Sequence, residues 1–185
     1  YGYYLEQAGL GQALRPNEDG YPAFMNFVAK YASCEKAHQL FYDYVKFILT
    51  RTNRYTKKKY KDDPAIMSWQ IGNEPRAFSK EQLPAFEKWL GEASKLIRSL
   101  DKNHLISIGS EGKFGCEGEL NCWERICADK NVDYCNIHLW PYNWSWARKD
   151  HLQEDLEISC QNTKEYIDEH LEVCGRIRKP LVMEE

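Results

Sequence analysis

Short apolar runs that alternate with amphipathic helical segments constrain the fold of this chain more than any other feature. Helical spacing of apolar residues predicts helices over residues 37–53, 83–100 and within about 159–178. The apolar runs fit buried strands and comprise residues 65–71, 105–108, 134–139 and 180–183. Strands separated by helices predict right-handed βαβ units and a parallel sheet. Residues 1–36 show no sustained period, and their Gly, Pro, Asn and Asp content predicts a long loop region on the N-terminal side.

Polar residues gather directly after these apolar runs. Asn73 and Glu74 follow the first run, Glu111 follows the second, and Glu184 and Glu185 follow the last. Barrels of parallel strands and helices place their chemistry at this end of the strands. A doubly wound sheet shares the alternation, but its Gly-rich phosphate-binding loops, GxGxxG or GxxxxGK(S/T), do not occur here. The sequence therefore predicts an α/β fold of the (β/α)8 TIM barrel type.

The length limits how much of such a barrel is present. An eight-stranded barrel typically needs about 250 residues, whereas this chain has 185. Four predicted strands with their connections correspond to the middle part of a barrel, about strands 4 to 7. We therefore expect residues 1–185 to form a single, incomplete domain.

The charge balance argues against two classes of partner. Lys and Arg total 25 against 28 Asp and Glu, so a formal net charge of −3 gives no chain-wide attraction to nucleic acid or anionic lipid. No stretch approaches the roughly 20 apolar residues that span a bilayer. Basic and aromatic residues alternate over 51–61, as in some RNA-binding segments, but a solvated helix end is the favoured interpretation. We expect no nucleic-acid partner and no membrane insertion.

Seven cysteines leave at least one thiol without a partner inside the chain. Cys116, Cys122, Cys127 and Cys135 are separated by five, four and seven residues, and none of them forms the CxxC pair of a structural zinc site. We expect no metal. Buried thiols, or a disulfide of Cys116 with Cys122 or Cys127, both remain open.

Carboxylates at two different strand ends suggest a reaction. Glu74 and the pair Glu184–Glu185 can meet across a substrate if their strands belong to one barrel. Glycoside hydrolysis needs such a pair, because one carboxyl group protonates the leaving oxygen while the other attacks the sugar carbon or activates water.

The chain resembles the family 5 glycoside hydrolases and, within them, the endo-β-1,4-mannanases. Gly72-Asn73-Glu74-Pro75-Arg76 is the central matching motif, and Gly11-Gln12-Ala13-Leu14 is a weaker one. The other matching segments occur in the family's order from residue 50 to the end, at residues 50–53, 60–69, 109–112, 138–141 and 179–185. The resemblance implies that residues 1–185 belong to a glycoside hydrolase catalytic domain.

The resemblance also implies roles for single residues. Glu74 matches the general acid/base, and Glu185 matches the nucleophile, with Glu184 as the alternative one residue away. The implied substrate-binding residues are Asn73 for the sugar's 2-hydroxyl, Arg76 and Glu111 for further sugar contacts, the cleft histidine His138, and Trp140. Alternatively, Arg76 and Glu111 form only an ion pair at the rim.

Trp140 departs from the family, which commonly has a Tyr there that hydrogen-bonds the nucleophile. An indole N–H donates one hydrogen bond and accepts none, so that role does not transfer directly. Tyr142, Trp144 and Trp146 follow Trp140, and we expect one or two of these four rings to line the sugar cleft.

The implied activity is that of a retaining endo-β-1,4-mannanase that acts on mannan, glucomannan or galactomannan by double displacement. The resemblance implies no cofactor, a monomer, and a secreted or extracytoplasmic location. Two alternatives stay open: a β-1,4-glucanase or cellulase of the same fold, and a non-catalytic carbohydrate-binding barrel protein.

Overall fold

The computed structural model describes residues 1–185 and confirms the alternation of strands and helices. The strands are β1 (Ser68–Gln70), β2 (Leu105–Ser107), β3 (Cys135–Ile137) and β4 (Leu181–Met183). The helices that follow the first three strands are α5 (Leu83–Leu100), α6 (Leu120–Ala128) and α7 (Leu156–Ile177), of which α6 was not predicted. Three short 3-10 helices lie in the connections: η2 (Tyr60–Asp62), η3 (Lys80–Gln82) and η4 (Lys113–Cys116).

The prediction of a long loop over residues 1–36 is wrong, because this region is mostly helical. It forms α1 (Gly2–Ala8), α2 (Pro16–Asp19), α3 (Tyr21–Val28) and the 3-10 helix η1 (Ala29–Ser33), before α4 (Glu35–Thr50). Pro16 and Pro22 stand in the first turns of α2 and α3, where the missing N–H costs no hydrogen bond. Elements this short complete too few turns for an apolar period to stand out in the sequence.

The strands pair in parallel, as predicted, and form two two-stranded sheets, β1–β2 and β3–β4. Ser68 of β1 is opposite Leu105 of β2, and Cys135 of β3 is opposite Leu181 of β4. The two pairs meet where the Asp133 N–H donates to the Ile106 carbonyl oxygen at 2.8 Å. The carboxyl ends of all four strands therefore lie at one edge.

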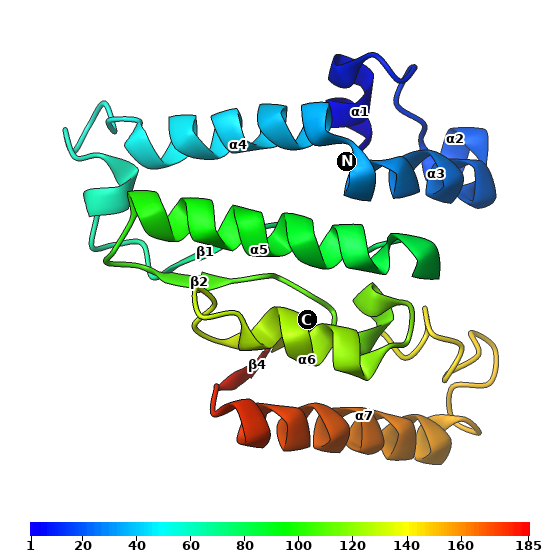
Figure 1. Ribbon diagram of the computed structural model, residues 1–185. Coiled ribbons are helices and arrows are strands. Elements are labelled where there is room, and N and C mark those ends of the chain that lie inside the picture. Colours follow the sequence, from blue (N-terminus) through cyan, green and yellow to red (C-terminus); the bar gives the residue numbers. More distant parts are fainter.

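Helices α4 to α7 lie side by side in the same order (Figure 1). Their apolar stripes pack against one another and against the strands, so that Phe86 of α5, Trp123 of α6 and Val173 of α7 are almost fully buried together with Ile106 and Ile137. No helix combines the length and apolar character that a membrane span requires.

All seven cysteines are free thiols. The structure brings Cys116 within hydrogen-bonding contact of Cys122, and this contact, together with burial, raises the pKa of the Cys116 thiol. Cys135 similarly contacts Cys127 and Cys174. Of the two possibilities left by the sequence, the structure shows the buried thiols.

Candidate active site

Glu74 lies in the segment that follows β1, where hydrogen bonds to β2 continue beyond the strand. The Gly72 N–H donates to Ile108 O at 3.3 Å, and the Glu74 N–H donates to Gly109 O at 2.9 Å. Glu74 has a φ of +47°, which is uncommon for a residue with a side chain, and such strain often occurs at functional sites. A Cβ atom on Gly109 (φ +74°) would collide with the Gly72 carbonyl oxygen. Gly109 thus permits the close approach that fixes Glu74.

The β3–β4 ladder likewise continues past its strands and positions His138, Glu184 and Glu185. The Glu184 N–H donates to Ile137 O at 3.1 Å, and the Leu139 N–H donates to Glu185 O at 2.9 Å. The backbones of Glu184 and Glu185 are therefore tied to the two residues that flank His138.

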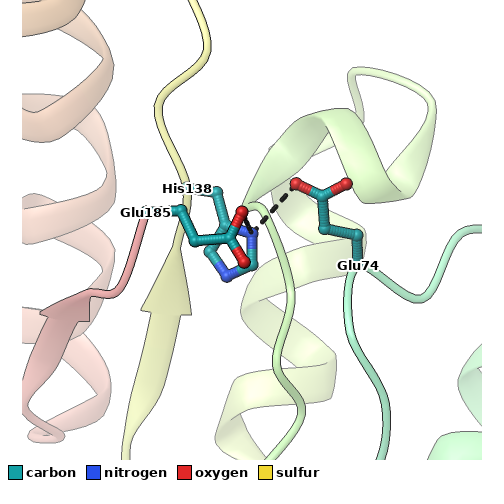
Figure 2. Close-up of side chains that lie close together, drawn as sticks. All are labelled: Glu74, His138 and Glu185. Carbon is teal, nitrogen blue, oxygen red and sulfur yellow. Dashed lines mark hydrogen bonds and ion pairs between the residues drawn. The ribbon is translucent and has the colours of Figure 1, made fainter.

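His138 stands between the two carboxylates that the sequence singled out (Figure 2). Its Nδ1 lies 3.0 Å from Glu74 Oε1 and 3.7 Å from Glu185 Oε2. Glu184 instead approaches the other ring nitrogen, with its Oε2 3.6 Å from Nε2, and accepts a hydrogen bond from the Gln70 amide. His138 is 1% exposed, so its ring is held firmly between these groups. The structure therefore brings Glu185, rather than Glu184, to the side of His138 that Glu74 occupies.

The same three side chains are the candidate metal ligands, since single ligand atoms of Glu74, His138 and Glu185 lie within 4.8 Å of one another. However, Nδ1 is already hydrogen-bonded to Glu74, and paired carboxylates act in glycoside hydrolysis without a metal. The expectation of a site without metal stays a prediction.

Arg76 and Glu111 form a two-point ion pair beside this centre. The Arg76 Nη2 donates to Glu111 Oε2 at 2.6 Å, and its Nε donates to Oε1. Burial raises the pKa of the Glu111 carboxyl, and Arg76 offsets part of that rise. Burial also works to lower the pKa of Arg76, but the hydrogen bonds and charge of Glu111 raise it above its usual value. The two parallel hydrogen bonds from the planar Arg76 guanidinium group to the Glu111 carboxylate fix both side chains in one orientation.

Most of the predicted site residues line a cleft of about 460 Å³. Five of the seven predicted site residues contribute to its walls, namely Asn73, Glu74, Arg76, Glu111 and Trp140. His138 contacts Glu74 from outside this set, and Glu185 in turn lies beside His138. Of the four rings from Trp140 to Trp146, Trp140 and Trp144 line the cleft, in agreement with the expected one or two.

Four further aromatic residues of the cleft were missed by the sequence analysis. Tyr21 and Phe24 lie on α3, inside the region expected to be a loop, and Tyr1 and Phe78 lie beside them. The Tyr1 hydroxyl also accepts a hydrogen bond from the Arg76 backbone N–H at 3.1 Å. The high content of Tyr and Trp, 12 and 6 residues, was the only sequence signal for such rings.

A buried histidine supports the segment next to Glu111. The Lys113 N–H donates to His170 Nε2 at 3.0 Å, so the other nitrogen, Nδ1, carries the proton and donates to Tyr166 O at 2.6 Å. Burial lowers the pKa of His170 to about 4. The imidazole is therefore neutral at pH 7.

We expect the free energy of unfolding to fall by about 3 kcal/mol through His170 alone as the pH decreases from about 6.5 to about 4. In this window an unfolded histidine takes up a proton while the folded His170 does not, so acid favours the unfolded chain. Urea unfolding at pH 7 and pH 4.5 measures the difference, and His170→Gln should flatten it. The exposed His151 supplies the control substitution His151→Gln. An unchanged acid dependence in His170→Gln would contradict the assignment.

The family model described as "GH family 5 beta-mannosidase-like" matches residues 3–185. Among similar curated proteins, mannan endo-1,4-beta-mannosidase 4 of Solanum lycopersicum is 32% identical over 150 residues, which cover 76% of this chain and 36% of that protein. Mannan endo-1,4-beta-mannosidase 1 of Arabidopsis thaliana is 31% identical over 196 residues, which cover 98% and 43%. The chain thus spans well under half the length of these relatives.

Solved structures resemble the chain over the same region. The glycoside hydrolase family 5 mannosidase from Rhizomucor miehei superimposes with a TM-score of 0.81 at 28% identity, covering 99% of this chain and 43% of that one. The endo-β-1,4-mannanase from Thermotoga petrophila gives a TM-score of 0.68 at 25% identity, covering 84% and 35%.

Proposed function

This chain belongs to the family 5 glycoside hydrolases of the β-mannosidase-like type, and from that premise we propose that the protein hydrolyses β-1,4-mannosidic bonds within mannan, glucomannan or galactomannan. The observation that carries the proposal is that one carboxylate oxygen of Glu74 and one of Glu185 lie within 4.8 Å of each other, with the Nδ1 of His138 close to both. Carboxyl groups about 5 Å apart are typical of retaining glycosidases, whereas inverting enzymes separate them by about 6.5–9.5 Å.

The proposed mechanism is double displacement. Glu74, protonated, gives its proton to the glycosidic oxygen while a Glu185 oxygen attacks the anomeric carbon, so that a glycosyl-enzyme forms and the leaving sugar departs. Glu74, now a carboxylate, then takes a proton from the water that attacks the same carbon and releases Glu185. The Nδ1 of His138 orients the Glu74 carboxyl group and lies on the same side as Glu185. Each displacement inverts the carbon, so the product keeps the β configuration.

The walls of the cleft suit a polysaccharide. Trp140 and Trp144 offer flat apolar faces to the C–H surfaces of sugar rings. Arg76 offers charged N–H donors to sugar hydroxyls while the buried Glu111 holds its guanidinium group, and Asn73, next to Glu74, takes the proposed contact with the 2-hydroxyl. The ion pair and the sugar-binding role are compatible, because the paired side chains also line the cleft.

We also propose that the complete protein closes this set of parallel strands into a (β/α)8 barrel. The four strand units in chain order and the TM-score of 0.81 with a family 5 mannosidase support this architecture. A polymeric substrate is too large to cross a membrane, which supports the proposal of an extracytoplasmic location. We also propose that the enzyme acts as a monomer.

Proton NMR during hydrolysis of matched β-1,4-mannan and β-1,4-glucan oligosaccharides tests the function. We expect faster cleavage of the mannan oligosaccharide and the β anomer as the first product, because the two carboxylates are close enough for direct attack. Faster cleavage of the glucan would support the cellulase alternative instead. Initial accumulation of the α anomer would contradict the retaining mechanism.

A further inference from the structure

The turn from Glu111 to Lys113 connects the cleft to helix α7. Glu111 extends its carboxylate to Arg76, while its own carbonyl oxygen accepts a hydrogen bond from the Tyr166 hydroxyl at 2.7 Å. Two residues later, the Lys113 N–H donates to His170 Nε2 at 3.0 Å. Tyr166 and His170 lie one helical turn apart on α7, so a single helix face holds the turn at two points.

The fit between the turn and α7 leaves no free space. Gly112 has a φ of +100°, and a Cβ atom there would collide with the Tyr166 hydroxyl and lie 2.7 Å from His170 Nε2. Tyr166 is 2% exposed and His170 is fully buried. The turn therefore has one position relative to the helix, and the direction of the Glu111 side chain depends on that position.

A hydrogen bond within α7 determines which nitrogen of the His170 ring accepts the hydrogen bond from the turn. His170 Nδ1–H donates to Tyr166 O at 2.6 Å, which leaves Nε2 as the acceptor for the turn. Beside it, the Lys113 ammonium group pairs with Glu169 at 2.6 Å. The contact thus combines two neutral hydrogen bonds, one of them buried and the other partly buried, with one ion pair.

The ring of Tyr166 also supports a second wall of the cleft. It stacks on Phe114 with a centroid distance of 5.4 Å and an interplanar angle of 11°. It lies 5.1 Å from Trp144, whose ring lines the cleft together with Arg76 and Glu111. Removing only the hydroxyl of Tyr166 would leave this packing in place.

We propose that Tyr166 and His170 are positioning residues for sugar binding, because they hold the Glu111–Lys113 turn and thereby set Glu111 against Arg76. This inference rests on the proposed function. Neither Tyr166 nor His170 touches the reacting atoms, and neither Arg76 nor Glu111 acts as the general acid or the nucleophile. Substitution of Tyr166 or His170 should therefore change substrate affinity, whereas kcat depends on Glu74 and Glu185.

The substitution Tyr166→Phe tests the inference. We expect KM for a β-1,4-mannan oligosaccharide to rise about fivefold, the equivalent of one ordinary hydrogen bond, while kcat stays within about twofold. Calorimetric titration with the same oligosaccharide in a Glu74→Gln background should show the same loss of affinity. His170→Phe, which removes the acceptor but keeps a flat ring, should shift KM in the same direction.

Coupling to Glu111 separates a positioning role from a merely structural one. If Tyr166 acts through Glu111, Tyr166→Phe should raise KM no further in a Glu111→Ala background. Tyr134→Phe is the matched control, since it removes another buried hydroxyl, bonded to Ser68 Oγ at 2.9 Å, at the opposite ends of the strands. It should leave KM unchanged.

Three outcomes would overturn the inference: an unchanged KM in Tyr166→Phe, an equal rise in KM with and without Glu111, or a rise of the same size in Tyr134→Phe. Each of them leaves the proposed function intact. A wild-type protein that does not hydrolyse mannan oligosaccharides would contradict the proposed function itself, so the two failures are distinguishable.

Discussion

Glu185→Gln is expected to reduce kcat on mannan by on the order of 10⁵-fold, the largest effect of any substitution in this chain. An amide oxygen does not displace the leaving sugar, so no glycosyl-enzyme forms. The structure supports this choice because Glu185 approaches the same ring nitrogen of His138 that Glu74 contacts. Initial rates on mannan, together with mass spectrometry of the protein treated with a slow 2-deoxy-2-fluoro mannoside, measure both the loss of turnover and the labelled residue.

Glu184→Gln is the matched control for this experiment. Glu184 is the adjacent residue of the same type, but it contacts Gln70 and the opposite ring nitrogen of His138. Its substitution removes a supporting contact and should lower kcat by about tenfold or less. If Glu184→Gln abolished turnover and Glu185→Gln preserved it, the assignment of the nucleophile would be wrong by one residue.

Glu74→Gln is expected to reduce kcat on mannan by about 10²–10⁴-fold, the usual contribution of a general acid. The loss should be much smaller for formation of the glycosyl-enzyme from an aryl mannoside whose leaving group needs no proton. Affinity for mannan oligosaccharides should remain, since Asn73, Arg76 and Glu111 keep their places in the cleft. Steady-state rates on both substrates and calorimetric titration measure these three quantities.

Glu117→Gln provides the control for Glu74→Gln. Glu117 also has a left-handed backbone, with a φ of +53°, but it lies at the end of η4 outside the cleft. We expect unchanged turnover in this variant. A wild-type protein that binds mannan without turnover, and is unaffected by Glu74→Gln, would favour the non-catalytic binding protein over the hydrolase.

The predicted fold was most accurate where a local pattern is long enough to repeat. The apolar stripe of α5 spans 18 residues, so its period was visible, and the runs that became β1, β2 and β4 were each followed closely by polar residues. The helices within the first 36 residues were missed because they are too short for such a pattern: α2 has four residues, and α1 and α3 have seven and eight. Such short helices take their stability from burial, as Leu5 and Val28 show, and less from their own sequence.

The chemical composition of the site was also visible in the sequence, whereas its geometry was not. Asn73, Glu74 and Arg76 form a contiguous motif, and the parallel topology requires strand ends to share one edge. No local pattern, however, connects Glu111 to Tyr166, which is 55 residues away, or brings Tyr21 and Phe24 into the cleft. Contacts between distant segments depend on how helices pack, and packing is decided by the complete set of side chains.

The sequence by itself therefore determined the family, the parallel α/β pattern and the residue types of the candidate site, because these depend on order and spacing along the chain. Only the tertiary structure decided that Glu185, and not Glu184, lies on the Glu74 side of His138. It also decided that Arg76 and Glu111 form an ion pair and at the same time line the cleft. Finally, it showed that α7 is hydrogen-bonded to the turn from Glu111 to Lys113. Distances of a few ångströms between separate strand ends depend on the register of the sheet and on close approaches such as that of Gly109 to Gly72, which no single segment encodes.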